Sequence, residues 1–282
     1  MSNLQNKIDF VVIVKVSNAN PNGDPLNGNR PRTTYTGQGE ISDVCIKRKI
    51  RNRLQDMGEN IFVQSADRSI DEYTSLSERA ANNIKSYSSS DDYAKQACEM
   101  WFDVRSFGQV FAFKSKDKKD NVSVGVRGPV SIHHAISCSP VDINSMQITK
   151  SVNGEPSEGR SSDTMGMKHF VEFGLYKIKG SINVQLAEKN GFTEEDAEKV
   201  KEALRTLFIN DASSARPDGS MEVVTVYWWK HNNKIGQYSA AKVHDSLRIT
   251  LKEGVLIPAS VEDYQITVES LPGLEPEIIA GI

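Results

Sequence analysis

A short apolar run, IDFVVIVKV from Ile8 to Val16, sets the first restriction on the fold. The run is nearly continuous and rich in Val and Ile, which predicts a buried strand rather than a helix. Residues 18–32, NANPNGDPLNGNRPR, follow as a loop thick with Asn, Gly and Pro. Such a loop can approach another backbone closely, because Gly lacks a side chain and Asn offers both a donor and an acceptor.

A helical period begins shortly after this loop. Ile46, Ile50 and Leu54 recur every four residues and therefore lie on one helix face. Ser42 suits the N-cap position, and Asp43 suits the positive end of the helix. The sequence predicts an amphipathic helix that starts at Ser42.

The same segment is strongly basic, although the chain has a formal net charge of -3. The basic residues are Lys47, Arg48, Lys49, Arg51 and Arg53. Like charges one turn apart on a helix cost stability unless an anion offsets them, and Asp43 is the only acidic residue at that spacing. The pattern favours a polyanion as partner, with phosphates near the helix start. A solvated helix face without a ligand is the alternative.

The remaining patterns outline an α+β fold. Residues 59–102 are polar and Ser-rich, and we interpret them as an inserted, mobile subdomain without a core of its own. Further strands are expected at 103–113, 122–137, 171–186, 221–229 and 246–251, a long hairpin with a polar tip at 146–170, and a second helix at 193–208. The order strand, helix, strand, strand, helix, strand is the ferredoxin-like plan, here with two large insertions.

Bulk features exclude several functional classes. The three cysteines are widely spaced and form no CxxC pair, which argues for a reducing compartment and against a disulfide framework or a thiolate zinc site. The N-terminus has no signal pattern and no apolar run approaches membrane-spanning length, so we predict a cytoplasmic protein with no membrane partner. The histidines lack metal-site spacing, and no local motif pairs a nucleophile with a base. We therefore predict no metal, no cofactor and no enzymatic activity.

Two other segments carry candidate ligand contacts. In DTMGMKHF, residues 163–170, Met165 and Met167 lie two apart beside Lys168 on the expected hairpin arm. Exposed Met side chains can wedge between bases, whereas filling a gap in the core is the alternative. Arg216, in the loop DASSARPDGSM, could donate to phosphates, or the loop could be only a turn.

Five blocks of sequence carry a resemblance to a known family. They are NPNGDPLNGNRPR, SDVCIKRKIR, DVRSFGQVF, GPVSIHHAIS and TMGMKHFVEFGLY, in this order over nearly the whole chain. The chain closely resembles the backbone subunit of type I CRISPR surveillance complexes (Cascade), a RAMP-superfamily protein, and most nearly that of subtype I-C. The resemblance implies a non-enzymatic subunit that polymerises along a CRISPR RNA and lets the guide pair with target DNA in antiviral defence.

The resemblance also implies a hand-shaped fold in one domain, residues 1–282. An RNA-recognition-like (ferredoxin-like) palm would comprise 1–58, 103–145 and 171–282, with helical fingers at 59–102 and a long β-hairpin thumb at 146–170. The thumb of each copy is expected to fold over a neighbour's RNA segment. Expected partners are CRISPR RNA, target DNA through the guide duplex, neighbouring copies of the chain, and the crRNA-processing, large and small Cascade subunits.

RNA-binding positions follow from the matching blocks. With Arg216 added from its loop, the predicted residues are Asn20, Arg30, Arg32, Ser42, Lys47, Arg48, Arg51, Met165, Met167, Lys168 and Arg216. Related backbone subunits of other CRISPR types cleave target RNA through a loop aspartate, so a metal-dependent ribonuclease that uses Asp24 or Asp43 is the alternative. The acidic C-terminal stretch SLPGLEPEIIAGI either packs on a neighbouring copy or is disordered.

Overall fold

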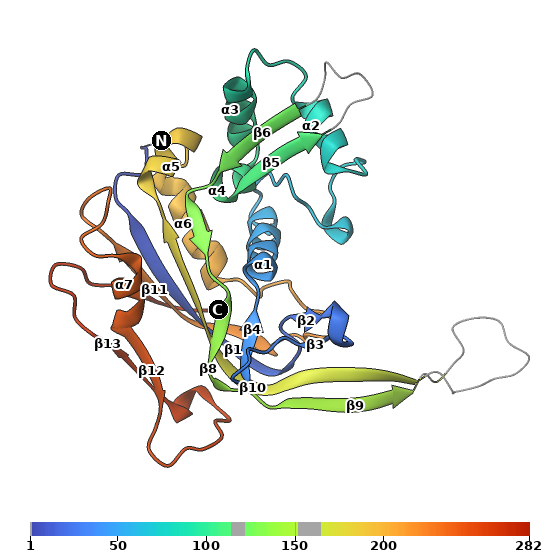
Figure 1. Ribbon diagram of the computed structural model, residues 1–282, viewed down its shortest axis with the longest axis vertical. Coiled ribbons are helices and arrows are strands. Elements are labelled where there is room, and N and C mark those ends of the chain that lie inside the picture. Colours follow the sequence, from blue (N-terminus) through green and yellow to red (C-terminus); the bar gives the residue numbers. More distant parts are fainter. Residues whose placement is uncertain (1, 114–121, 150, 152–164) are drawn as a thin grey trace, which may run out of the picture.

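The computed structural model describes residues 2–113, 122–149, 151 and 165–282, and is built around one large antiparallel sheet (Figure 1). In spatial order its strands are β14 (Glu277–Ala280), β11 (Met221–Lys230), β1 (Ile8–Ala19), β10 (Met165–Ile182), β8 (Ala135–Pro140) and β4 (Gln38–Ile41), with β14 and β4 at the edges. Two more strands, β7 (Val130–Ile132) and β9 (Ile143–Thr149), pair with β10. The predicted buried strand is thus confirmed as the centre of the sheet.

Both faces of β1 are covered, which explains why its sequence is a continuous apolar run. Phe10 and Val12 pack on one side of the sheet, whereas Val11 and Ile13 belong to a separate cluster on the other side. All four side chains are fully buried. Because successive residues of a strand point to opposite faces, only a strand buried on both faces needs apolar residues at every position.

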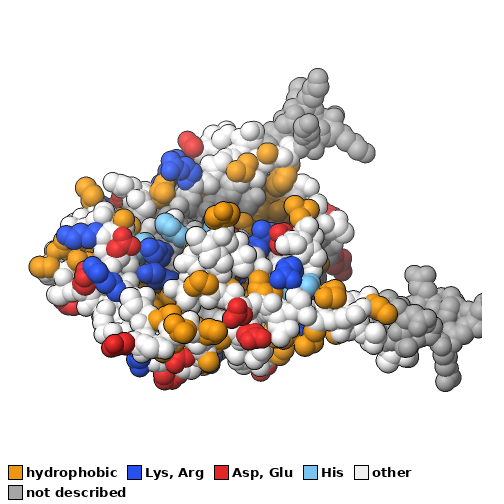
Figure 2. Space-filling view, turned by 60° about the horizontal axis from the view of Figure 1, so that its bottom comes forward, with side chains coloured by type: hydrophobic (Ala, Val, Ile, Leu, Met, Phe, Trp, Pro, Cys, Tyr) orange, Lys and Arg blue, Asp and Glu red, His pale blue; other side chains and the backbone are white. Residues whose placement is uncertain are grey.

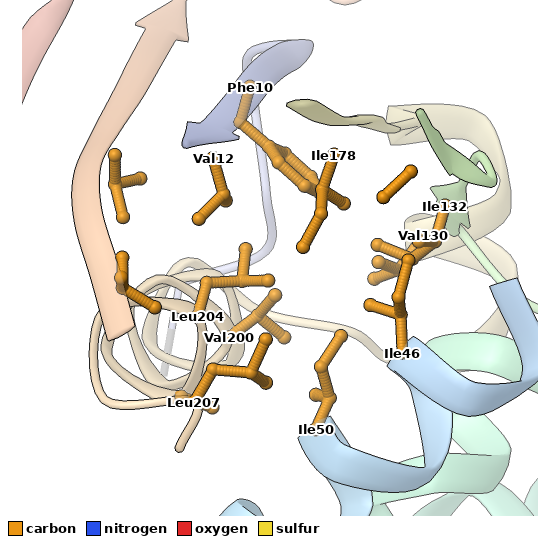
Figure 3. Close-up of a cluster of buried hydrophobic side chains, with 14 of the residues drawn as sticks. Phe10, Val12, Ile46, Ile50, Val130, Ile132, Ile178, Val200, Leu204 and Leu207 are labelled. Atoms are coloured by element: carbon orange, nitrogen blue, oxygen red, sulfur yellow. The ribbon is translucent and has the colours of Figure 1, made fainter. Parts of the chain in front are cut away.

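Two helices cover the first face. Figure 3 shows Ile46 and Ile50 of α1 (Asp43–Asp56) and Val200 and Leu204 of α6 (Glu194–Arg205) beneath Phe10, Val12 and Ile178. The predicted cap is confirmed, since the Ser42 hydroxyl accepts from the backbone N–H of Cys45 at 3.3 Å. Thr193 and Asp196 form the capping box of α6, which follows the short helix α5 (Val184–Asn190).

A C-terminal layer covers part of the second face. It comprises α7 (Ala240–Ser246), β12 (Leu247–Leu251), the 3-10 turn η4 (Val261–Asp263) and β13 (Tyr264–Val268). Val243 and Leu247 of this layer pack on Val11 and Trp229 of the sheet. The C-terminal stretch is ordered, since β14 pairs with β11 at the edge of the same sheet, and its packing on a neighbouring copy stays a prediction.

The inserted region has a hydrophobic cluster of its own, so the interpretation of 59–102 as lacking a core is wrong. Its elements are η2 (Ala66–Arg68), α2 (Leu76–Asn83), α3 (Ser90–Met100), α4 (Phe102–Phe107), β5 (Gly108–Phe113) and β6 (Val122–Arg127). Phe62, Tyr93, Trp101 and Phe111 lie at the centre of this cluster. The pair β5–β6 forms a separate two-stranded sheet here, instead of belonging to the palm sheet as predicted.

Residues 103–107 are helical, which corrects the predicted strand at 103–113. Phe102 packs in the main core, whereas Val104 packs in the cluster of the inserted region. A helix of six residues that lies between two cores is buried on more than one side, so its apolar pattern does not show a helical period. Gly108, with a φ of 79°, ends the helix. The single strand predicted at 122–137 is also divided, into β6, β7 and the start of β8.

The predicted hairpin is confirmed where it is described. Met165 pairs with Thr149 and Val171 with Ile143, and the two strands project from the body of the molecule (Figure 1). The predicted polar tip lies outside the described residues. A second small hairpin, β2 (Gly23–Asp24) and β3 (Arg30–Pro31) around the 3-10 turn η1 (Pro25–Asn27), lies in the loop after β1. No helix in the described part of the chain is long and apolar enough to span a membrane.

Candidate nucleic-acid interface

The loop after β1 is held in one conformation by amide side chains. Asn20 is buried, and its Nδ2 donates to the backbone oxygen of Asn29 at 2.6 Å. The Oδ1 of Asn22 accepts from the backbone N–H and the hydroxyl of Ser42, at 2.9 Å each. A Cβ at Gly23 would lie 2.0 Å from the Oδ1 of Asn29, so glycine is required at this contact. The loop is therefore a fixed surface joined to the start of α1.

Two predicted arginines connect this loop to its surroundings. Arg30 donates from Nη1 to the hydroxyl of Ser145 on β9, at 2.7 Å. The Nη2 of Arg32 lies 3.3 Å from Oδ1 of Asp24, the same oxygen that accepts from the N–H of Leu26. Arg30 thus links the loop to the projecting hairpin, and Asp24 serves as a cap and an ion-pair partner.

The projecting hairpin carries exposed apolar side chains on both of its faces. Met165 and Met167 are 64% and 56% exposed, which rules out the alternative that they fill gaps in the core. Met146 and Ile148 are also exposed, at 43% and 48%. Met167 is opposite Gln147 and Ile148 is opposite Gly166, so Met167 and Ile148 point to different faces of the ribbon. Exposed apolar groups on such an arm are typical of an interaction surface.

Three segments far apart in the sequence meet at the base of this hairpin. They line a hollow of about 330 Å³, which we term the hairpin-base hollow. Its lining residues are Asn20, Gly28, Asn29, Ile148, Met167, Lys168, His169, Ser214 and Ala215. Arg216 adjoins it, because its Nη1 lies 3.5 Å from the backbone oxygen of Asn20. The structure thus brings Asn20, Met167 and Lys168 together, as an RNA-binding surface at these residues requires.

Asn29, Ile148 and His169 also line this hollow, although the sequence did not single them out. Asn29 carries one usable signal, since Asn readily adopts the positive φ of 59° that it has here. The positions of Ile148 and His169 depend on the strand register, which the sequence pattern did not reveal. Figure 2 shows a Lys or Arg side chain next to a His side chain at the base of the projecting arm.

The basic residues of α1 do not form the predicted exposed ridge. Lys49 is 5% exposed and pairs with Asp211, and burial lowers the pKa of Lys49. The Nε of Arg51 donates to Oδ2 of Asp103 at 2.9 Å, and Asp103 is 1% exposed. Arg51 is thus engaged by Asp103 within the subunit, and its contact with RNA stays a prediction. The carboxylate partners come from segments 52 and 162 residues away, so the local spacing could not reveal them.

The other predicted RNA-binding side chains of α1 also form contacts within the subunit. Lys47 pairs with Asp43 at 2.9 Å, and both side chains are 26% exposed. Arg48 donates from Nη1 to the backbone oxygen of Val63 at 2.6 Å, and burial lowers its pKa. These two side chains and the Ser42 N-cap stay predictions as RNA contacts.

The two aspartates considered as magnesium ligands are engaged in other contacts. Asp43 accepts from Lys47 and lies 3.2 Å from Nε2 of His134. Burial alone would raise the pKa of Asp43, but the hydrogen bond and charge of Lys47 lower it overall. Asp24 caps η1 and pairs with Arg32. In the described ranges of the chain, no three His, Cys, Asp or Glu side chains are grouped so that they could hold a metal ion.

Comparisons with known proteins place the chain. The family described as CRISPR-associated protein Cas7 matches residues 6–269, which is most of the sequence. The chain belongs to the Cas7 family. A curated protein of Haloferax volcanii named CRISPR-associated protein Cas7 is 25% identical over 211 residues, 69% of this chain, and the match spans only 62% of that protein.

The fold has a counterpart among solved structures. A chain of a structure described as "CRISPR RNA-guided surveillance complex, pre-nicking" is 14% identical, with a TM-score of 0.50. The likeness covers 88% of this chain and 83% of that chain. At this identity the comparison concerns the fold, a mixed arrangement of helices around a large antiparallel sheet.

Proposed function

We propose that this Cas7-family chain is a non-enzymatic backbone subunit of a CRISPR RNA-guided surveillance complex, and that several copies assemble along one CRISPR RNA. The observation that carries the proposal is the hairpin-base hollow, where Asn20, Lys168 and Ser214 meet beside exposed Met side chains. A lysine and several amide and hydroxyl groups suit phosphate and sugar contacts, which position RNA without reading its sequence. A guide held in this way keeps its bases available for pairing with target DNA.

Buried polar atoms near the hollow support a ligand there. The Oδ1 of Asn20 and the Nε of Arg216 are buried without a hydrogen-bond partner among the described residues, although the Nε lies 3.6 Å from Oδ2 of Asp211. Leaving such groups unsatisfied costs about 1–3 kcal/mol each. A strand with ribose hydroxyls and phosphates supplies both a donor and acceptors, after a small movement of the loop that holds Arg216.

The finer assignments belong to the same proposal. We assign the chain to a type I-C Cascade in which its partners are CRISPR RNA, target DNA, neighbouring copies and the processing, large and small subunits. The sheet order β11-β1-β10-β8, with α1 before β8 and α6 before β11, supports a ferredoxin-like palm. The β9–β10 hairpin corresponds to a thumb, and the inserted region with its own cluster corresponds to fingers that extend past residue 102 to β6.

The ribonuclease alternative is disfavoured by the contacts of its two candidate ligands. The Asp24 carboxylate is shared between Leu26 and Arg32, and that of Asp43 between Lys47 and His134. A magnesium ion would have to displace a cation from each aspartate. Incubation of the assembled complex with complementary RNA and Mg²⁺ would produce regularly spaced fragments only if this alternative held.

The proposal is tested by purifying the chain gently after co-expression with a guide. We expect a 260/280 nm absorbance ratio typical of a ribonucleoprotein and several copies per RNA. The double variant Met167→Ala, Lys168→Gln should weaken guide binding about tenfold, similarly for all guide sequences, because it removes a phosphate contact and an apolar wedge. Fluorescence anisotropy with guides of different sequence provides the measurement.

Ile70→Ala with Lys95→Gln is the matched control, since both residues are exposed in the inserted region. It removes one apolar and one basic side chain and should leave the guide affinity unchanged. Wild-type protein that purifies without nucleic acid would contradict the proposed function. A loss of affinity confined to certain guides would contradict contacts to the backbone of the RNA.

A further inference from the structure

A second hollow lies on the face of the sheet opposite to α1 and α6. The C-terminal layer covers this face as far as β12 and leaves it open over β8 and the edge strand β4. The hollow measures about 420 Å³. Its lining includes Gln38, His133, His134, Lys177, Lys179 and Ile249, and we term it the β8–β10 hollow. None of the residues predicted to bind RNA lines it.

Two lysines of β10 supply its positive charge. Lys177 and Lys179 are two positions apart on one strand, so they point to the same face with roughly 7 Å between their Cα atoms. The Nζ of Lys177 donates to the backbone oxygen of Leu247 at 3.2 Å, and within the described residues Lys177 forms no ion pair. Burial lowers the pKa of Lys177, and the charge of Lys179 lowers it further. A bound anion would offset both effects.

The nearby carboxylates neutralise little of the positive charge of Lys177 and Lys179. Lys179 lies 3.2 Å from Asp245, which is 72% exposed, and such an exposed ion pair contributes little. Glu40 and Asp43 both contact the imidazole of His134, at 2.6 Å and 3.2 Å. These two carboxylates are thus directed to His134 and not to the lysines. An anionic ligand can therefore approach Lys177 and Lys179.

An exposed aromatic residue lies three residues before Gln38, which lines this hollow. Tyr35 is fully exposed, with a relative accessibility of 106%. Its turn is rigid, because the N–H of Gly37 donates to the oxygen of Thr34 at 3.1 Å and the N–H of Gln38 donates to the Thr34 hydroxyl at 3.2 Å. Gln38 itself lines the hollow. A tyrosine presented in this way loses little entropy when a base stacks on it.

We propose that the β8–β10 hollow binds the sugar-phosphate backbone of a single nucleic-acid strand other than the guide. The two lysines contact neighbouring phosphates, and Tyr35 stacks on a base. Two cations together with an exposed aromatic ring on a nearby turn favour a single strand, since stacking requires an unpaired base. The inference rests on the proposed function, because pairing of a guide with one strand of a duplex releases the other as a single strand.

The two hollows are separate sites. Lys177 lies nine residues from Lys168 along β10, which corresponds to about 30 Å. One nucleotide cannot contact both lysines over this distance. A variant of the β8–β10 hollow can therefore lose the second strand while it retains the guide.

The test uses the complex assembled on its guide and a labelled pyrimidine strand that is not complementary to that guide. Fluorescence anisotropy should show that Lys177→Gln with Lys179→Gln weakens strand binding at least about tenfold. The slope of log affinity against log salt should fall by about 1.4, or about 0.7 for each lost phosphate contact. The guide content of the complex, measured from the absorbance ratio, should not change.

Tyr35 provides a second variant that cannot act through folding, because its side chain packs on nothing. Tyr35→Ala should weaken strand binding at least about fivefold, and Tyr35→Phe should retain it, because stacking needs only the ring. Lys85→Gln with Lys95→Gln is the control of equal charge, placed on the exposed surface of the inserted region.

Four outcomes would overturn the inference. The lysine variant could bind the strand as tightly as the control does. It could bind duplex DNA more tightly than a single strand. It could also lose an acidic protein subunit while its binding of the strand is unaffected. Loss of the guide itself from the lysine variant would also overturn it, because the hollow would then hold the guide. Wild-type protein that never retains a guide would instead refute the proposed function.

Discussion

The basic face of α1 and the lysines of β10 are both rich in positive charge, but the fold engages them differently. Lys49 is buried and Arg51 is partly buried, and they pair with the carboxylates of Asp211 and Asp103. Lys177, also partly buried, has only a backbone oxygen as its partner among the described residues. The number of basic residues in a segment therefore says less about its ligands than the carboxylates that the fold brings to it.

The largest expected effect tests whether the charge on α1 is structural. Asp103→Ala removes the acceptor of Arg51 at 2.9 Å and of the N–H groups of Phe62 and Val63 at 2.7 and 3.1 Å. The free energy of unfolding should fall by about 3–5 kcal/mol, because a buried cation and two buried donors lose their partner. Urea unfolding followed by circular dichroism provides the measurement.

Asp245→Ala is the matched control, because it removes the carboxylate that pairs with a lysine of β10. Its partner is Lys179, and the Asp245 side chain is 72% exposed, so the change should cost less than about 0.5 kcal/mol. Equal and small losses for the two aspartates would mean that Arg51 does not need Asp103. The basic face of α1 would then again be a candidate RNA surface.

A smaller effect on stability comes from His244, a basic group that is buried in its neutral form. His244 is 2% exposed and contacts the backbone oxygen of Gly180 at 2.9 Å, and burial lowers its pKa below the ordinary 6.5. At a pH between the lowered pKa of His244 in the folded chain and its ordinary pKa in the unfolded chain, the unfolded chain binds more protons than the folded one. Stability is therefore complete above about pH 6.5 and falls as the pH decreases, by at most about 1.4 kcal/mol per pH unit for one group.

Urea unfolding at pH 7.5 and 5.5 measures this dependence. His244→Gln should reduce the difference in stability between the two pH values, because Gln does not titrate. His133→Gln, at an exposed neighbouring position, should keep the wild-type difference. A His244→Gln protein with an unchanged pH dependence would show that His244 is not held neutral by burial.

The smallest expected effect is on stability at the projecting arm. Met165→Ala should change the free energy of unfolding by less than about 0.5 kcal/mol, because the side chain is 64% exposed. Thermal unfolding should show no shift beyond error, whereas guide binding should weaken. A loss of several kcal/mol would mean that Met165 packs in the folded subunit, and the arm would lose its role as a binding surface.

Local patterns predicted the parts of the fold in which one rule dominates. The apolar run at Ile8 to Val16 predicted β1, and the cap at Ser42 with Ile46 and Ile50 predicted α1. The hairpin around Met165 was also predicted, because its strands lie on either side of a polar tip. At the candidate site, Asn20, Met167 and Lys168 were predicted and do lie together.

The failures share one physical cause, which is dependence on contacts between distant segments. Asp103 lies in a short helix between two cores, and no residue close to it in the sequence indicates that it accepts from Arg51. The hollow at Lys177 lies where the C-terminal layer stops covering the sheet, next to β12. No local sequence pattern shows where one layer stops covering another. Ion pairs between residues far apart in the sequence likewise cannot be predicted from local spacing.

Photo-crosslinking of a guide RNA in the assembled complex, with the crosslinked peptides identified by mass spectrometry, tests the account most directly. We expect crosslinks in residues 18–32, 165–170 and 211–217, the segments that meet at or adjoin the hairpin-base hollow. Crosslinks concentrated on Lys49 to Arg53 of α1, with none at the base of the hairpin, would contradict it.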